Sequence, residues 1–292
     1  MKKRIVTAVI CLFCIIISAG VYYIFNSKPE TEYTIERQVR YGFTVQNKTN
    51  RAIKNAEFLV YGPVKQTASQ LCKSLTSSHP YDLKTDKSGN QILRFRFDVL
   101  PPYASKIIKI KADMLFAEVP NKTDVDSEMY LKPQLFVESD HPEIIAEAKK
   151  LEKNNILLTT ENINAWVAGY IDYAGYISRE RGALYALTHR KGDCTEYMDL
   201  FVALCRSLKI QARGIGGYIC TKNTILKPVD YHNWSEFYHK GRWQIADTQN
   251  KKFMEQQSHY LAMKIIAPEN DTNKKSFNRY KINNDDLKVK MN

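Results

Sequence analysis

Three residues of this chain have the types and the order of a nucleophilic triad: Cys194, His232 and Asp247. A cysteine beside a histidine can attack a carbonyl carbon, because the imidazole accepts the thiol proton and the thiolate is the nucleophile. A carboxylate that accepts a hydrogen bond from the imidazole fixes its tautomer and stabilises its charged form. These residues therefore predict covalent catalysis, with Cys194 as nucleophile, His232 as general base and acid, and Asp247 as the orienting residue.

The residues around Cys194 predict that it occupies the first turn of a helix. Asp193 is a good N-cap residue, and Glu196, three residues later, completes a capping box. Apolar residues then recur at helical spacing from Met198 to Leu208. Because the partial positive charge of a helix N-terminus stabilises a thiolate, this position suits a nucleophile. The backbone N–H of the cysteine is the expected oxyanion donor.

The residues around His232 and Asp247 predict a β-hairpin that brings the two side chains together. A turn centred between residues 239 and 240 would place them directly opposite each other. A turn centred on Lys240-Gly241 would make them diagonal neighbours, two residues out of register. Both registers leave the side chains on one face of the hairpin, with their Cβ atoms roughly 5–8 Å apart.

Three segments in order resemble the transglutaminase-like superfamily: GDCTEYMDLFVALCRSLKIQARGIGGY, HNWSEFY and GRWQIADTQ. The resemblance covers about residues 140 to 250. It implies a papain-related core with a Cys-His-Asp triad, whose roles fall on Cys194, His232 and Asp247. Lys209 stands where the family usually has a glycine that closes the helix, a departure that does not touch the chemistry.

Length and patterning predict an α+β chain in which a β-sandwich precedes this papain-like core. A chain of 292 residues suits about two domains. Residues 31–118 alternate with period two and predict an all-β, immunoglobulin-like sandwich, which resembles the arrangement of many exported bacterial relatives. Residues 119–138 are expected to be a linker and residues 139–268 the catalytic domain. Residues 269–292 are expected to be a polar segment with at most a short strand near Phe277 to Ile282.

Residues 1–28 predict a basic cytoplasmic tip and a transmembrane helix. Ile5 to Phe25 is an uncharged, mainly apolar run behind Lys2-Lys3-Arg4. Such a run spans about 30 Å, the thickness of a bilayer core, and the positive flank keeps the N-terminus inside. We expect a single-pass protein of the cytoplasmic membrane with its C-terminal domains outside the cytoplasm. Cleavage as a signal peptide at Ser18-Ala19-Gly20 is the alternative.

The net charge of +12 is spread along the chain rather than gathered in one stripe, so no nucleic-acid partner is expected. Affinity for anionic surfaces, such as lipid headgroups or acidic wall polymers, and simple lysine-rich solvated faces both fit this charge. His189, His239 and His259 lack metal-ligand spacing, and no acidic loop resembles a calcium site. Neither a metal nor another cofactor is expected.

These features predict a membrane-anchored thiol enzyme that acts on amide bonds through an acyl-enzyme, by hydrolysis or by acyl transfer to an amine. Proteins, peptides and small amides all remain possible substrates. One alternative is a non-catalytic peptide-binding or envelope scaffold module that keeps the fold. Another is a thiol-redox protein using Cys194 with Cys205 or Cys220, although no C-x-x-C motif is present. The disulfide state of Cys72, Cys205 and Cys220 is left open.

Overall fold

The computed structural model describes residues 32–124, 128–176, 179–268, 277 and 279–292. The predicted transmembrane run Ile5 to Phe25 lies outside these residues. Within the described part of the chain, no helix is both long and apolar enough to cross a membrane. Tyr33–Asn292 form one compact unit, which is described below.

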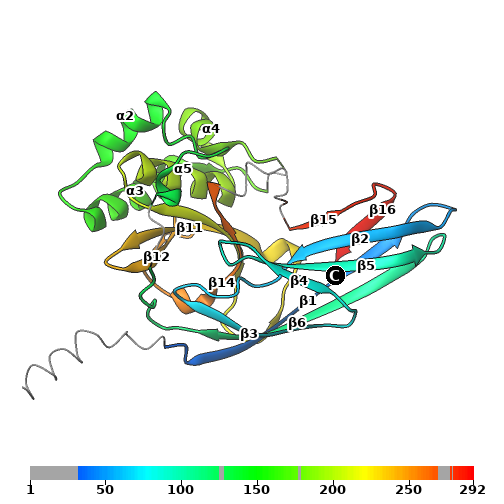
Figure 1. Cartoon of the computed structure of the whole chain (residues 1–292). Helices are drawn as coiled ribbons and strands as arrows, with labels where there is room; N and C mark the ends of the chain where they lie inside the picture. Colours follow the sequence, from blue (N-terminus) through cyan, green and yellow to red (C-terminus); the bar gives the residue numbers. More distant parts are fainter. Residues whose placement is uncertain (1–31, 125–127, 177–178, 269–276, 278) are drawn as a thin grey trace, which may run out of the picture. The chain divides into compact units, whose positions relative to one another are not determined.

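The first half of this unit consists of two sheets that share a core (Figure 1). β1, β6 and β3 neighbour one another in one sheet, and β2, β5 and β4 in the other. Alternate residues such as Phe43, Phe58 and Phe95 are buried between them, which explains the period-two pattern of the sequence. The strands are β1 (Ile35–Asn47), β2 (Ile53–Tyr61), β3 (Gln70–Ser77), β4 (Asp82–Thr85), β5 (Gln91–Leu100) and β6 (Ser105–Phe116).

Segments from the second half of the chain extend both sheets. β10 (Thr224–Ile225) pairs in parallel with β1, and β16 (Leu287–Met291) pairs with β1 in the antiparallel sense. β15 (Tyr280–Ile282) pairs with β2. The sequence predicted at most one short strand here, near Phe277 to Ile282, where β15 lies, and it did not predict β16. Its lysines alternate with buried Leu287 and Met291, a pattern too short to stand out from a lysine-rich sequence.

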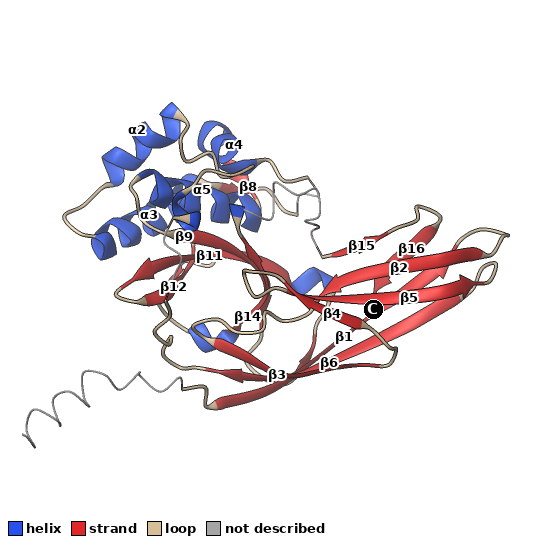
Figure 2. Ribbon diagram, viewed as in Figure 1, coloured by secondary structure: helices blue, strands red, loops and turns tan. Residues whose placement is uncertain are grey.

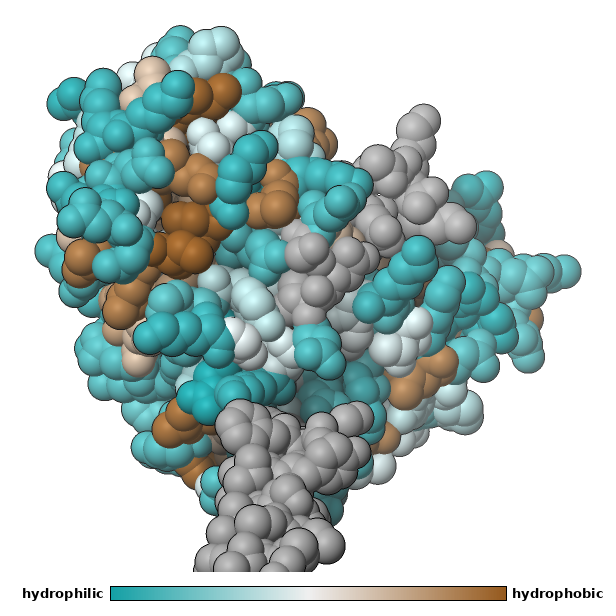
Figure 3. Space-filling view, turned by 60° about the vertical axis from the view of Figure 1, so that its left-hand side comes forward, coloured by the Kyte–Doolittle hydropathy of each residue, from teal (hydrophilic) through white to brown (hydrophobic). Residues whose placement is uncertain are grey.

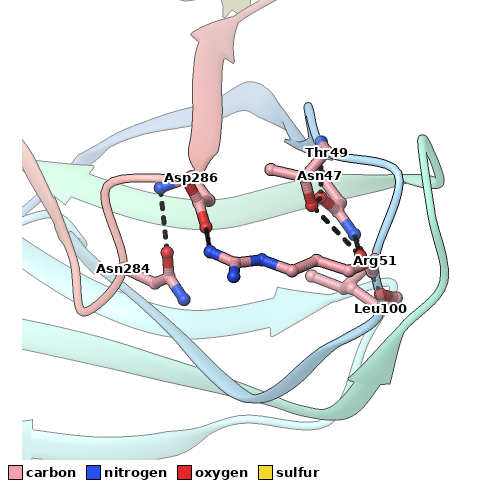
Figure 4. Close-up of polar contacts among 6 residues, drawn as sticks. All are labelled: Asn47, Thr49, Arg51, Leu100, Asn284 and Asp286. Carbon is pink, nitrogen blue, oxygen red and sulfur yellow. Dashed lines mark hydrogen bonds and ion pairs between the residues drawn. The ribbon is translucent and has the colours of Figure 1, made fainter.

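Figure 4 shows how the C-terminal segment is attached beside the β1–β2 turn. Arg51 Nη2 lies 2.8 Å from Asp286 Oδ2, and the Asp286 N–H donates to Asn284 Oδ1. This ion pair is exposed, so its contribution to stability is small. The buried amide of Asn47 donates to the carbonyls of Arg51 and Leu100 and satisfies acceptors at the end of the sandwich.

The second half of the unit is a mixed layer of helices and one sheet (Figure 2). The strand order is β13-β12-β11-β9-β14. The strands are β9 (Ala212–Ile219), β11 (Tyr231–His239), β12 (Arg242–Asp247), β13 (Lys252–Phe253) and β14 (Tyr260–Ile266). Helices gather on one side of this sheet: α2 (Pro142–Leu151), α3 (Ile156–Tyr170), α4 (Gly182–His189) and α5 (Cys194–Ser207). A short parallel pair, β7 (Asp172–Tyr173) with β8 (Lys191–Gly192), leads into α5.

The two halves share hydrophobic cores. The helical face of the sheet buries Phe237 with residues of α5. The opposite face buries Trp234 and Tyr260 together with Val64, which comes from the loop after β2. The core of the sandwich itself includes Leu261 of β14. Strand pairing and core packing thus cross residues 119–138, the linker predicted from the sequence.

The face drawn in Figure 3 is largely hydrophilic, with hydrophobic side chains lying among hydrophilic ones. Such mixing is ordinary for a folded protein, because there is not enough polar surface to cover the whole molecule. Two aromatic residues that follow α3 are exposed, Tyr173 by 59% and Tyr176 by 75%. Tyr173 belongs to β7 and pairs with Gly192 of β8, two residues before Cys194.

Lys209 closes α5 in a left-handed conformation, with φ 61°. The N–H of Ile210 donates to the Cys205 carbonyl, and the N–H of Lys209 donates to the Arg206 carbonyl. This is the Schellman arrangement, in which glycine is favoured because a Cβ strains the left-handed backbone. Because Lys209 stands where glycine is favoured, the backbone at the end of α5 is strained.

Lys209→Gly is expected to raise the free energy of unfolding by ~0.5–1 kcal/mol, because relief of left-handed strain exceeds the entropy that glycine adds to the unfolded chain. Urea denaturation measures the change. Lys222→Gly is the matched control, since Lys222 is exposed and does not have a positive φ. If the free energy of unfolding of Lys209→Gly is equal to or lower than that of the wild type, the backbone at Lys209 is not strained.

Candidate active site

Cys194 is the first residue of α5, as predicted. The Asp193 side chain accepts the Thr195 N–H at 2.8 Å, and Glu196 Oε2 accepts the Asp193 N–H at 2.9 Å. Both halves of the predicted capping box are therefore present. The thiol is partly buried and unpaired with another cysteine. It lies where the helix N-terminus favours negative charge.

The hairpin adopts the second of the two predicted registers. Lys240-Gly241 form the turn, with φ of 49° and 80°, as a type I′ turn requires. Ser235 lies opposite Ala246. His232 consequently lies two residues beyond the position opposite Asp247, on the same face of the hairpin.

The structure brings Cys194, His232 and Asp247 together. His232 Nε2 lies 2.8 Å from Asp247 Oδ2, which leaves Nδ1 as the ring nitrogen for the thiol. Burial lowers the pKa of His232, but the hydrogen bonds to Asp247 and to Cys194 raise it more strongly, to about 9. The imidazole is therefore positioned and charged to stabilise a thiolate.

The Asp247 carboxylate is buried and held by two residues that the sequence did not single out. Tyr260 O–H donates to Asp247 Oδ2 at 2.9 Å, and Asn250 Nδ2 donates to the same oxygen at 2.7 Å. Burial raises the pKa of Asp247, whereas His232, Asn250 and Tyr260 together lower it below its ordinary value. Asn250 follows Asp247 by three residues, but this spacing is only a weak indication that the two side chains meet. Tyr260 is an aromatic residue at the start of a strand, and nothing in the sequence around it indicates a contact with Asp247.

Hydrogen bonds attach β11, which carries His232, to α5, which begins at Cys194. Asn233 Nδ2 donates to Thr195 Oγ1 at 2.9 Å, and Ser235 Oγ donates to the Met198 carbonyl at 3.2 Å. On the other face of the strand, the Trp234 ring stacks near His232, with an interplanar angle of 22°. These contacts fix the imidazole relative to the start of α5.

The arginine and tryptophan that flank the triad motifs have a structural role. Arg213 donates through Nε and Nη2 to Glu236 Oε2, at 2.8 and 2.7 Å. Its guanidinium lies 4.0 Å from the centre of the Trp243 ring. All three residues are buried. They join β9, β11 and β12, the strands that position His232 and Asp247.

The other described cysteines are unsuited to nucleophilic or redox chemistry. Cys72, Cys205 and Cys220 are free and buried. Burial raises the pKa of each thiol, to about 11 for Cys220. None of these three residues forms a disulfide in the described part of the chain, and a protonated, buried thiol reacts slowly.

No group of three or more His, Cys, Asp or Glu side chains in the described residues is arranged to hold a metal ion. His189 instead stacks on Tyr185, with ring centres 4.2 Å apart.

The model of the transglutaminase-like superfamily matches residues 145–248, a range that contains all three triad residues. No curated protein matches the chain in sequence. A crystal structure of a candidate cysteine protease from Cytophaga hutchinsonii is similar over 88% of this chain and 92% of its own, with 19% identity and a TM-score of 0.58. At this identity the likeness establishes the fold alone.

Two further solved structures are similar at lower scores. The periplasmic domain of TgpA from Pseudomonas aeruginosa has 15% identity and a TM-score of 0.37, over 68% of this chain and 90% of that one. Red sea bream transglutaminase has 12% identity and a TM-score of 0.29, over 72% of this chain and 48% of that one. Superpositions this loose carry no argument about activity.

Proposed function

Because residues 145–248 form a domain of the transglutaminase-like superfamily, we propose that this protein is a thiol enzyme that acts on amide bonds through an acyl-enzyme. The observation that carries the proposal is the contact of His232 with both Cys194 and Asp247. A scaffold that only binds peptides has no need of this arrangement.

In the proposed reaction the Cys194 thiolate attacks the carbonyl carbon of an amide. The backbone N–H at the start of α5 lacks an acceptor within the helix, so it is suited to bind the oxygen that becomes negative. His232 then donates its proton to the nitrogen of the departing amine, which leaves an acyl-thioester on Cys194. Water or a second amine then attacks the thioester, His232 accepts the proton that this nucleophile loses, and the departing sulfur becomes the thiolate again.

The charge of His232 sets the pH range of the proposed enzyme. Its raised pKa, about 9, keeps the imidazole protonated at neutral pH, when it must donate to the leaving amine. Above that pH the general acid is lost together with the counterion of the thiolate. Turnover should therefore decline on the alkaline side near pH 9.

For the location, we keep the prediction of a membrane anchor at residues 5–25 with the catalytic unit outside the cytoplasm. The apolar run and its basic flank support this placement. We also propose that the sandwich is immunoglobulin-like and supports the catalytic sheet rather than acting as a separate spacer. The shared cores and the pairing of β10 with β1 support this role.

Hydroxylamine capture tests the proposed chemistry without choosing between hydrolysis and transfer. Hydroxylamine attacks a thioester to give a hydroxamate, so it reports an acyl-enzyme whichever acceptor is natural. A panel of peptides and small amides is incubated with the full chain, and hydroxamates are measured by mass spectrometry. We expect products that require Cys194. Peptide binding without any hydroxamate or Cys194 adduct across the panel would favour the scaffold alternative.

A further inference from the structure

The surroundings of Asp247 extend beyond the three triad residues. Its Oδ2 accepts three hydrogen bonds, from His232, Asn250 and Tyr260, and its Oδ1 accepts the backbone N–H of Asn250 at 3.2 Å. Tyr260 comes from β14, at the far edge of the sheet from β12. We propose that Tyr260 and Asn250 are positioning residues that fix the Asp247 carboxylate against His232. This inference rests on the proposed function.

Tyr260 is suited to be a permanent donor. Its ring is buried, and it packs edge-on against Trp234 with ring centres 5.1 Å apart. Burial and the charge of Asp247 raise the pKa of Tyr260 well above its ordinary value, so the hydroxyl keeps its proton throughout the working pH range. Trp234 in turn stacks near His232. Tyr260 therefore contacts both the Asp247 carboxylate and the Trp234 ring that lies beside the imidazole.

Asn250 holds the same oxygen from a different position. It is exposed, and its Nδ2 lies 2.7 Å from Asp247 Oδ2 and 3.2 Å from His232 Nε2. The amide therefore lies beside both atoms of the His232–Asp247 hydrogen bond. Tyr260 fixes the carboxylate from within the core, and Asn250 fixes it from the surface.

The two donors also determine how strongly the carboxylate holds the imidazole proton. The ionisable groups that face His232 are Asp247 from β12 and Cys194 from α5, and those that face Tyr260 are Asp247 and Glu255. Each donated hydrogen bond draws negative charge away from Asp247. Removing a donor leaves a more basic carboxylate, so His232 should bind its proton more tightly.

The test compares Tyr260→Phe and Asn250→Ala with the wild-type full chain. His232 is followed by NMR titration of ¹³C-labelled imidazoles, and kcat and KM are measured with an amide that passes the hydroxylamine assay. We expect Tyr260→Phe to shift the His232 titration upward by about 0.5–1 pH unit. We expect kcat of both variants to fall about tenfold while KM stays within about twofold, since both side chains bind the Asp247 carboxylate.

Tyr238→Phe is the matched control, because the Tyr238 hydroxyl donates to the Thr123 carbonyl and not to the triad. It should leave both the titration and kcat unchanged. A wild-type titration near 9 that Tyr260→Phe does not move would overturn the inference and leave the proposed function standing, even if kcat falls. A wild-type His232 that titrates near its ordinary value of about 6.5 would instead remove the ion pair on which both depend.

Discussion

Cys194→Ala is expected to abolish amide turnover, with a loss of at least about 10⁴-fold in kcat. Without the sulfur no acyl-enzyme can form, and His232 has no thiolate to act with. Because the thiol is only partly buried at the start of α5, its removal leaves the capping box and the helix core in place. Circular dichroism and the thermal midpoint should therefore match the wild type.

The matched control for this loss is Cys220→Ala. Cys220 is a buried, free thiol whose pKa burial raises to about 11, and it contributes to the sandwich core rather than to the triad. We expect its turnover to remain within about threefold of the wild type, with a modest loss of stability. Retained turnover in Cys194→Ala would remove Cys194 as the nucleophile, whatever the control shows.

Asp247→Asn is expected to lower kcat by about 10³–10⁴-fold while preserving the fold. An amide can still accept or donate a hydrogen bond at this position, but it cannot supply the charge that holds His232 protonated. His232 should then titrate well below 9. Single-turnover kinetics with hydroxylamine separate the loss of acylation from any change in substrate binding. Wild-type rates in this variant would exclude Asp247 from the triad.

The same substitution has a second, pH-dependent effect on stability. His232 has a pKa of about 9 in the folded chain and about 6.5 when unfolded, so the folded state binds the proton more tightly between these values. This stabilisation is fully present below pH ~6.5 and is lost as the pH rises through about 9. Asp247→Asn should therefore be destabilised more strongly at pH 6 than at pH 10, as thermal denaturation can measure.

Local sequence chemistry was sufficient to predict where the triad residues lie. The Asp193–Glu196 capping box places Cys194 in the first turn without help from the rest of the chain. The hairpin could be reduced to two registers, and left-handed φ values at Lys240-Gly241 select one of them. Short-range rules of this kind work because caps and tight turns depend on residues within a few positions of one another.

Long-range pairing could not be predicted in this way. The contact of Tyr260 with Asp247 depends on the position of β14 in the sheet, which no local pattern specifies. The same holds for β10 and β16, short segments that pair with β1 only because the completed sandwich presents its edge. Residues in such strands look like loop or lysine-rich surface when they are considered alone.

The role of the sandwich changes once these contacts are known. A sequence of two patterned halves suggests two domains joined by a linker. In the structure, however, Val64 and Trp234 belong to one hydrophobic core, and Arg37 donates to the Cys220 carbonyl just before the loop that leads to His232. These contacts tie the sandwich to the sheet that carries His232, which supports our proposal that the sandwich and the catalytic sheet act as one unit.

The most direct test of the triad is the pH dependence of iodoacetamide alkylation at Cys194, with and without His232→Ala. Peptide mass spectrometry resolves each cysteine, and the buried Cys72, Cys205 and Cys220 serve as internal references. The thiolate–imidazolium pair predicts rapid labelling of Cys194 well below pH 8, lost in His232→Ala. Labelling that follows an ordinary thiol with a pKa near ~8.5, unchanged by the substitution, would contradict the proposed enzyme.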